Sequence, residues 1–327
     1  MDRRRQVVTL PLRRIWAAAL VAAACSSAPQ DTGPTGDAPP KASDIRSLRW
    51  LADGKDRVKF LTELPAACET PAAAPEQAEQ RLRGKIAFES PALLGGTAAR
   101  MELACASCHR NGRGNPDFFL EGLSDKPGTA DVTSSVMSKV RGDGNFNPVV
   151  IPDIAMRDGH QIKDRTGAEF RAKVHGLVEQ EFDGQVPPPA VTDAVIAYLD
   201  GLAPSACVAG APPVPFDLGY DLDAAEAAWT AAADPKLDEA TRLFYLRVAR
   251  LRLARIFERF VGPDLAPQRR EVLSLSSRLG EMAATLRAGQ IAAFTDPDWK
   301  GLRESLNRVA AKSLYNPDIV RAAFAQE

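Results

Sequence analysis

The sequence has no surplus of charge of either sign and no long apolar run. Its 41 lysines and arginines against 42 acids leave a formal net charge of −1, so the chain lacks the basic excess typical of a nucleic-acid-binding protein. The apolar run 15–24 has ten residues, too few to cross a bilayer as a helix. We find no internal repeat, which argues against solenoid and array architectures.

Cysteine and histidine are scarce, with five and three residues in a chain of 327. Only Cys105 and Cys108 lie close together, whereas Cys25, Cys68 and Cys207 stand alone. A structural zinc site usually needs a second close pair of ligands, and the sequence does not supply one.

The N-terminus has the features of an export signal. Five arginines precede the apolar run, and small residues close it before Cys25. This pattern predicts a secretory signal peptide over residues 1–24. A cysteine at this place resembles a bacterial lipoprotein signal, which implies lipidation of Cys25 and a membrane anchor, although Ala22 stands where leucine or valine is usual. The alternative is plain cleavage near Ala24, with Cys25 free or in a disulfide.

The remainder divides into three segments by composition. Residues 25–75, rich in Pro, Ala, Gly and Ser, predict a tether with a short amphipathic stretch near 45–61. Residues 76–207 predict a helical domain, and residues 215–327 a bundle of four antiparallel helices. The fold class expected is therefore all-α.

Apolar residues at three-to-four spacing define the expected helices. Those of the 76–207 domain are expected over 78–89, 168–181 and 190–202. Those of the bundle are expected near 222–233, 237–260, 267–290 and 298–313. The 237–260 helix carries six arginines, for which a solvated face is the expected role and a face toward an acidic partner the alternative.

Residues 105–109 form the motif Cys105-Ala106-Ser107-Cys108-His109, which is C-x-x-C-H, the attachment signature of c-type haem. Two thiols three residues apart lie on one side of a helical turn, at a separation that matches the two vinyl groups of a porphyrin. The next residue, His109, then lies beneath the iron as its proximal ligand. The motif predicts one covalent haem c on Cys105 and Cys108.

Two other interpretations of the cysteine pair remain. It could be half of a zinc site, but the other cysteines are single and distant. It could be a thioredoxin-like redox pair, but the flanking sequence does not read as strand, helix and strand. The export signal favours haem, because c-type haem is attached outside the cytoplasm.

The flanks of the motif resemble the cytochrome c fold, with 84–88 similar to its first helix and 197–202 to its last. More narrowly, they resemble one haem domain of the bacterial di-haem cytochrome c peroxidase and MauG-like group. That resemblance rests on Leu93-Leu94-Gly95-Gly96, on Asn111-Gly112-Arg113 and on Asp158-Gly159. It covers about residues 78–204 and implies a cytochrome c-like haem domain with long irregular loops, followed by the bundle. The chain departs from it at Arg157, where an aromatic or histidine is usual, and in having one C-x-x-C-H motif instead of two.

The resemblance also implies a sixth iron ligand some tens of residues beyond the motif. Met156, near the Asp-Gly pair, and His175, on the 168–181 helix, are the leading candidates, followed by His160 and Met137. An open or water-bound position is the remaining alternative. Methionine ligation would suit electron transfer, whereas an open position would permit peroxide chemistry.

Cys68 and Cys207 are the cysteines left over once Cys25 is assigned to the anchor and two others to haem. They flank the 76–207 domain, and the terminal helices of a cytochrome c fold pack together, so these chain ends should emerge close to each other. An oxidising compartment favours pairing, and we expect a Cys68–Cys207 disulfide. Two buried free thiols are the alternative.

The function expected is therefore electron transfer by a single-haem c-type cytochrome, exported to the periplasm, lipid-anchored to a membrane and serving redox partner proteins. The alternative is a peroxidase-like haem enzyme or the electron-input subunit of one. A third class is a binding or scaffold role for the 215–327 bundle.

Overall fold

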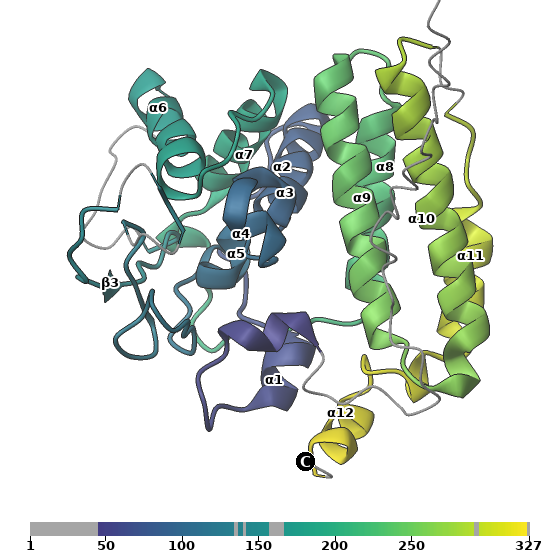
Figure 1. The fold of residues 1–327 in the computed structure, drawn as a ribbon, viewed down its shortest axis with the longest axis horizontal. Helices are drawn as coiled ribbons and strands as arrows, with labels where there is room; N and C mark the ends of the chain where they lie inside the picture. The colour runs from purple at the N-terminus through teal and green to yellow at the C-terminus, as the bar shows by residue number, and fades with distance from the viewer. Residues whose placement is uncertain (1–44, 134–136, 140–141, 157–166, 291–293, 326–327) are drawn as a thin grey trace, which may run out of the picture. The chain divides into compact units, whose positions relative to one another are not determined.

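The computed structural model describes residues 45–133, 137–139, 142–156, 167–290 and 294–325. The predicted signal peptide, Cys25, His160 and the stretch from Arg157 to Gly159 lie outside the described residues. The described residues belong to one compact unit and are mostly helical (Figure 1). The prediction of a mainly helical fold is confirmed at this level.

The helices of the N-terminal two thirds are short except for two. They are α1 (Arg57–Thr62), α2 (Pro75–Phe88), α3 (Pro91–Leu94), α4 (Gly96–Arg100), α5 (Cys105–Cys108), α6 (Ala168–Gly176) and α7 (Pro189–Gly201), with 3-10 turns η2 (Arg46–Trp50), η3 (Arg110–Gly112) and η5 (Pro204–Ala206) and a π turn η4 (Leu177–Glu181). The C-terminal helices are α8 (Leu218–Ala233), α9 (Glu239–Arg259), α10 (Ala266–Arg287), α11 (Trp299–Asn307) and α12 (Pro317–Phe324), with 3-10 turns η6 (Pro263–Leu265) and η7 (Ala310–Lys312).

The described strands are four two-residue segments that form two antiparallel pairs. In one pair, β1 (Glu63–Leu64) lies beside β4 (Val214–Pro215). In the other, β2 (Thr129–Ala130) lies beside β3 (Val149–Val150), and this pair joins two parts of the long irregular stretch after the motif. The β1–β4 pair joins the segment before α2 to the segment before α8.

Helices α2 and α7 cross at Gly84, and only a glycine fits there. A Cβ atom on Gly84 would lie 1.9 Å from the carbonyl oxygen of Ala194 and 2.9 Å from Cβ of Tyr198. Beside this crossing, the rings of Phe88 and Tyr198 pack with centroids 5.4 Å apart. The absence of a side chain at residue 84 therefore lets the first and last long helices of the 76–207 segment touch through their backbones.

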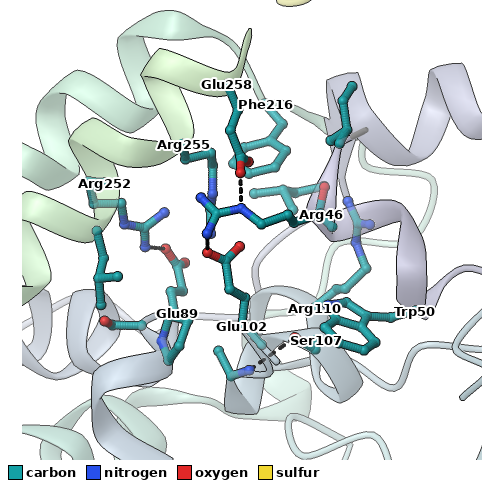
Figure 2. A pocket seen from close by; sticks show the side chains of 18 of the residues that line it. Arg46, Trp50, Glu89, Glu102, Ser107, Arg110, Phe216, Arg252, Arg255 and Glu258 are labelled. Atoms are coloured by element: carbon teal, nitrogen blue, oxygen red, sulfur yellow. Dashed lines mark hydrogen bonds and ion pairs between the residues drawn. The ribbon is translucent and has the colours of Figure 1, made fainter. Parts of the chain in front are cut away.

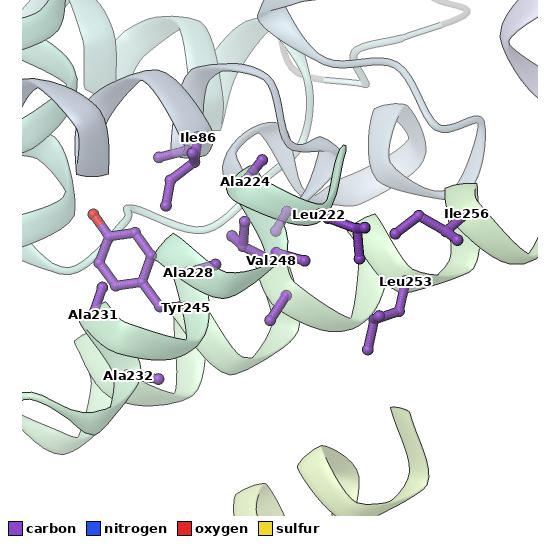
Figure 3. Packing of buried hydrophobic residues seen from close by; sticks show 14 of the residues in the cluster. Ile86, Leu222, Ala224, Ala228, Ala231, Ala232, Tyr245, Val248, Leu253 and Ile256 are labelled. Atoms are coloured by element: carbon purple, nitrogen blue, oxygen red, sulfur yellow. The ribbon is translucent and has the colours of Figure 1, made fainter. Parts of the chain in front are cut away.

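Helices α8, α9, α10 and α11 lie side by side, as the four-helix bundle prediction requires (Figure 1). Helix α8 contributes alanines to the packing with α9, among them the fully buried Ala228 and Ala232, and α9 contributes larger residues such as Leu253 and Ile256 (Figure 3). Small residues on one helix facing large ones on the other allow close packing without voids.

The bundle and the 76–207 segment share one hydrophobic core. Ile86 of α2 belongs to the same buried cluster as Leu222 of α8 and Val248 of α9 (Figure 3). Tyr198 of α7 is also a member of this cluster. The two segments thus pack as parts of one unit, since neither covers its apolar face alone.

The amphipathic stretch expected near 45–61 packs into the fold. Trp50 and Leu61 are almost fully buried, and Leu61 packs with Ile45 against Leu314 and Val320 at the C-terminal end of the chain. The part of the predicted tether before residue 45 lies outside the described residues.

Charged side chains are buried where the bundle meets α2. Arg252 of α9 donates to Glu89 at 2.5 Å and to Asp221 of α8 at 3.2 Å. Burial would raise the pKa of Asp221, but Arg255, Arg252 and Arg259 outweigh that effect and hold it below its usual value. The expectation of a solvated arginine face on 237–260 is wrong for Arg252 and Arg259, which are almost fully buried.

Arg252→Met should lower the free energy of unfolding by about 3–5 kcal/mol, because two buried carboxylates lose a counter-ion that no water replaces. Urea unfolding of the purified full-length protein measures this change. Arg247→Met, on the exposed face of the same helix, is the matched control and should stay within about 0.5 kcal/mol of the wild type. Equal unfolding midpoints for the two variants would show that the buried ion cluster does not join the segments.

Candidate functional site

The C-x-x-C-H motif forms one helical turn, α5, and the bend that follows it. The Ser107 hydroxyl accepts from the N–H of Ala104 at 3.1 Å, which satisfies a donor at the start of the turn. The N–H of His109 donates to the carbonyl of Cys105 at 2.8 Å. Cys105, Cys108 and His109 are thereby held on a single turn, and both cysteines are free thiols.

The chain reverses directly after the motif. Asn111 and Gly112 have positive φ angles of 52° and 75°, and a Cβ atom on Gly112 would lie 2.5 Å from Cδ1 of Leu202. Leu202 follows the last residue of α7 and is fully buried. The turn at Gly112 therefore packs the motif against the end of α7, and this turn requires glycine.

His109 presents one ring nitrogen, Nδ1, to the protein backbone. Its Nδ1 lies 3.1 Å from the carbonyl oxygen of Pro152, so Nδ1 must carry the proton and donate it to that carbonyl. Metal-binding histidines usually donate their second ring N–H in this way. Burial lowers the pKa of His109 to about 4, although the Pro152 carbonyl and Asp153 oppose the shift. His109 is thus neutral at neutral pH, in the form that binds a metal ion through Nε2.

The two motif thiols are unlike those of a disulfide oxidoreductase. Loss of surrounding water raises the pKa of the Cys105 thiol to about 12. It also raises the pKa of Cys108, with a further contribution from the neighbouring Cys105. Reactive C-x-x-C pairs have a lowered pKa instead, so these thiols do not support the thioredoxin-like interpretation. Within the described ranges, His, Cys, Asp and Glu form no group of three or more that could hold a metal ion, so the zinc interpretation gains no support either.

Apolar side chains surround the motif thiols. Cys105 and Cys108 pack against a buried cluster that includes Trp50, Phe118 and Met137. This cluster is separate from the core shared with the bundle, although Cys105 touches both. An apolar wall beside two thiols and a neutral imidazole suits a large, flat, mostly apolar group.

The candidates for a sixth ligand lie in different surroundings. Met156 is 37% exposed, and its Sδ lies 3.6 Å from Sγ of Cys207. His175 lies on α6, with Nε2 3.1 Å from the hydroxyl of Thr192. Met137 is 1% exposed and belongs to the cluster that contacts Cys105 and Cys108. The structure therefore places Met137, a minor candidate by sequence, in the apolar cluster against which the thiols pack.

Cys68 and Cys207 form a disulfide, with their sulfur atoms 2.03 Å apart. The bond joins the chain before α2 to the chain after α7, across a sequence separation of 139. Arg113, four residues after His109, places Nη1 3.2 Å from Sγ of Cys68 and donates from Nε to Asp153 at 2.5 Å. The disulfide is thus close to the motif, which its position in the sequence does not reveal.

A small cavity of about 110 Å³ lies on another side of the motif, between η2, α5 and α9. Arg46 crosses it and pairs with Glu102 and with Glu258 (Figure 2). Arg110 also lines the cavity, and it donates to the Phe60 carbonyl at 2.9 Å. Sequence analysis did not identify Arg46 or Arg110, because each acts through partners far away in the sequence.

No family model, curated protein or solved structure matches this chain. No helix within the described residues is both long and apolar enough to span a membrane.

Proposed function

We propose that this protein is a single-haem c-type cytochrome that transfers electrons in the cell envelope. The observation that carries the proposal is the motif turn: two free thiols and a neutral histidine share it, and the Pro152 carbonyl leaves only Nε2 of His109 to bind iron. Cys105 and Cys108 would hold the haem covalently, and His109 would be its proximal ligand. The bound group would supply a one-electron redox couple. Through it the protein would exchange electrons with partner proteins.

The packing of α2 on α7 supports a cytochrome c-like arrangement for the 76–207 segment. The resemblance implies that the helices around 84–88 and 197–202 cross beside the haem. In the structure, α2 and α7 cross at Gly84 next to the Phe88–Tyr198 ring pair. The relationship to one haem domain of the di-haem peroxidase and MauG-like group remains part of this proposal.

The first test is covalent attachment. Protein made together with a haem-attachment system should exceed its apo-mass by one haem, and acid–acetone should not extract the group. Cys105→Ala or Cys108→Ala should weaken or abolish attachment. The double variant Cys68→Ala/Cys207→Ala removes the two disulfide cysteines and should still carry covalent haem. A wild-type protein whose haem washes out completely would refute the proposal.

We further propose Met137 as the sixth ligand, because it is almost fully buried and belongs to the apolar cluster against which the motif thiols pack. The oxidised wild type should then show the weak far-red absorption band of methionine-ligated haem. Met137→Ala should lose this band and become high-spin, whereas Met156→Ala, which alters an exposed methionine next to the disulfide, should keep it. A high-spin wild type would instead favour the peroxidase-like enzyme as the function.

Export and lipid anchoring of the protein belong to the same proposal. The Cys68–Cys207 disulfide supports export, because disulfides persist in oxidising compartments. Metabolic labelling with a fatty acid should mark the wild-type protein in a bacterial host and leave Cys25→Ala unlabelled. Equal labelling of both, or labelling of neither, would refute lipidation at Cys25 and leave the haem proposal standing.

A further inference from the structure

A continuous series of contacts connects the disulfide to the histidine of the motif. Arg113 lies 3.2 Å from Sγ of Cys68 through Nη1, and its Nε donates to Oδ2 of Asp153 at 2.5 Å. Asp153 directly follows Pro152, whose carbonyl oxygen lies 3.1 Å from Nδ1 of His109. Arg113 and Asp153 are both partly buried, with side chains 28% and 21% exposed.

The backbone that carries the Pro152 carbonyl is fixed on both sides. The N–H of Ile151 donates to Gly128, and the N–H of Ala155 donates to Gly112 at 3.1 Å. The other carboxylate oxygen of Asp153 accepts from the N–H of Met156 at 3.1 Å. Asp153 therefore both caps its own loop and ties that loop to Arg113, which adds a side-chain restraint on the Pro152 carbonyl to the two backbone hydrogen bonds.

We infer that Asp153 and Arg113 are positioning residues for the iron ligand His109, with the Cys68–Cys207 disulfide as the fixed support of Arg113. This inference rests on the proposed haem function. A carbonyl held against Nδ1–H increases the basicity of the imidazole, and a more basic ligand stabilises ferric over ferrous iron. The Arg113–Asp153 pair thus lowers the reduction potential by keeping the carbonyl in place.

The test compares three variants of the haem-loaded full-length protein. Asp153→Asn has the same shape and keeps an oxygen for the N–H of Met156, but it loses the ion pair. Arg113→Gln removes the same pair from the other side and also the contact with Cys68. Glu69→Gln is the matched control, because it breaks the 2.8 Å ion pair of Glu69 with Lys85 beside Cys68 without touching the Pro152 loop.

Two measurements report on the ligand rather than on stability alone. Redox titration should show a more positive reduction potential for Asp153→Asn and for Arg113→Gln. The expected change is about tenfold in the oxidised-to-reduced ratio at a given potential, which corresponds to about 59 mV for a one-electron couple. Proton exchange at Nδ1 of His109, followed by NMR of the reduced protein, should be faster in both variants. Glu69→Gln should match the wild type in both measurements.

The outcomes separate this inference from the haem proposal. Covalent haem with unchanged potential and unchanged Nδ1 exchange in both variants would overturn the positioning role and leave the cytochrome proposal intact. A lower melting temperature without a change of potential would likewise assign the pair a purely structural role and overturn the inference. A wild type that binds no haem would overturn both.

Discussion

The close crossing of α2 and α7 at Gly84 is the contact on which the rest of the motif region depends. Because nothing larger than hydrogen fits between Gly84 and Ala194, the two helices meet through their backbones and fix where each helix ends. The end of α7 carries Leu202, against which Gly112 is packed directly after the motif. The chain before α2 and the chain after α7 then lie close enough for Cys68 and Cys207 to bond. One missing side chain thus determines where both the motif turn and the disulfide are placed.

The C-terminal bundle packs against the 76–207 segment and supplies partners for one of its buried charges. Glu89, at the end of α2, has its charge compensated by Arg252 of the bundle, and the hydroxyl of Tyr220 donates to the same carboxylate at 2.5 Å. A buried carboxylate without such partners is costly. The 76–207 segment alone would therefore expose both an apolar face and an unpaired acid, which explains why bundle and segment share one core.

Local sequence patterns predicted the helices well, and contacts between distant residues account for what they missed. The expected bundle helices agree with α8–α11 at their starts to within a few residues, although α11 ends earlier, because apolar spacing is a local property. The motif was recognisable for the same reason. The burial of Arg252 was not, since an arginine among other arginines on a helix reads as solvated until its partners Glu89 and Asp221 are known. The residues that cover the amphipathic 45–61 stretch could not be predicted either, because they lie at 314–320, at the other end of the chain.

The hydrogen-bond partner of His109 could not be predicted from the sequence, because it is a backbone carbonyl and does not depend on residue type. A main-chain carbonyl such as that of Pro152 is present at every position, so only the path of the irregular stretch after the motif can select it. Two contacts hold the described part of this stretch: the β2–β3 pair joins Thr129–Ala130 to Val149–Val150, and the Asn115 side chain donates to the Ser107 carbonyl at 2.8 Å. An irregular stretch held in this way positions the backbone partner of His109. Substitutions near Pro152 should therefore alter the chemistry at His109. Those of buried residues such as Ala155, which belongs to the shared core, should lower the stability of the fold as well.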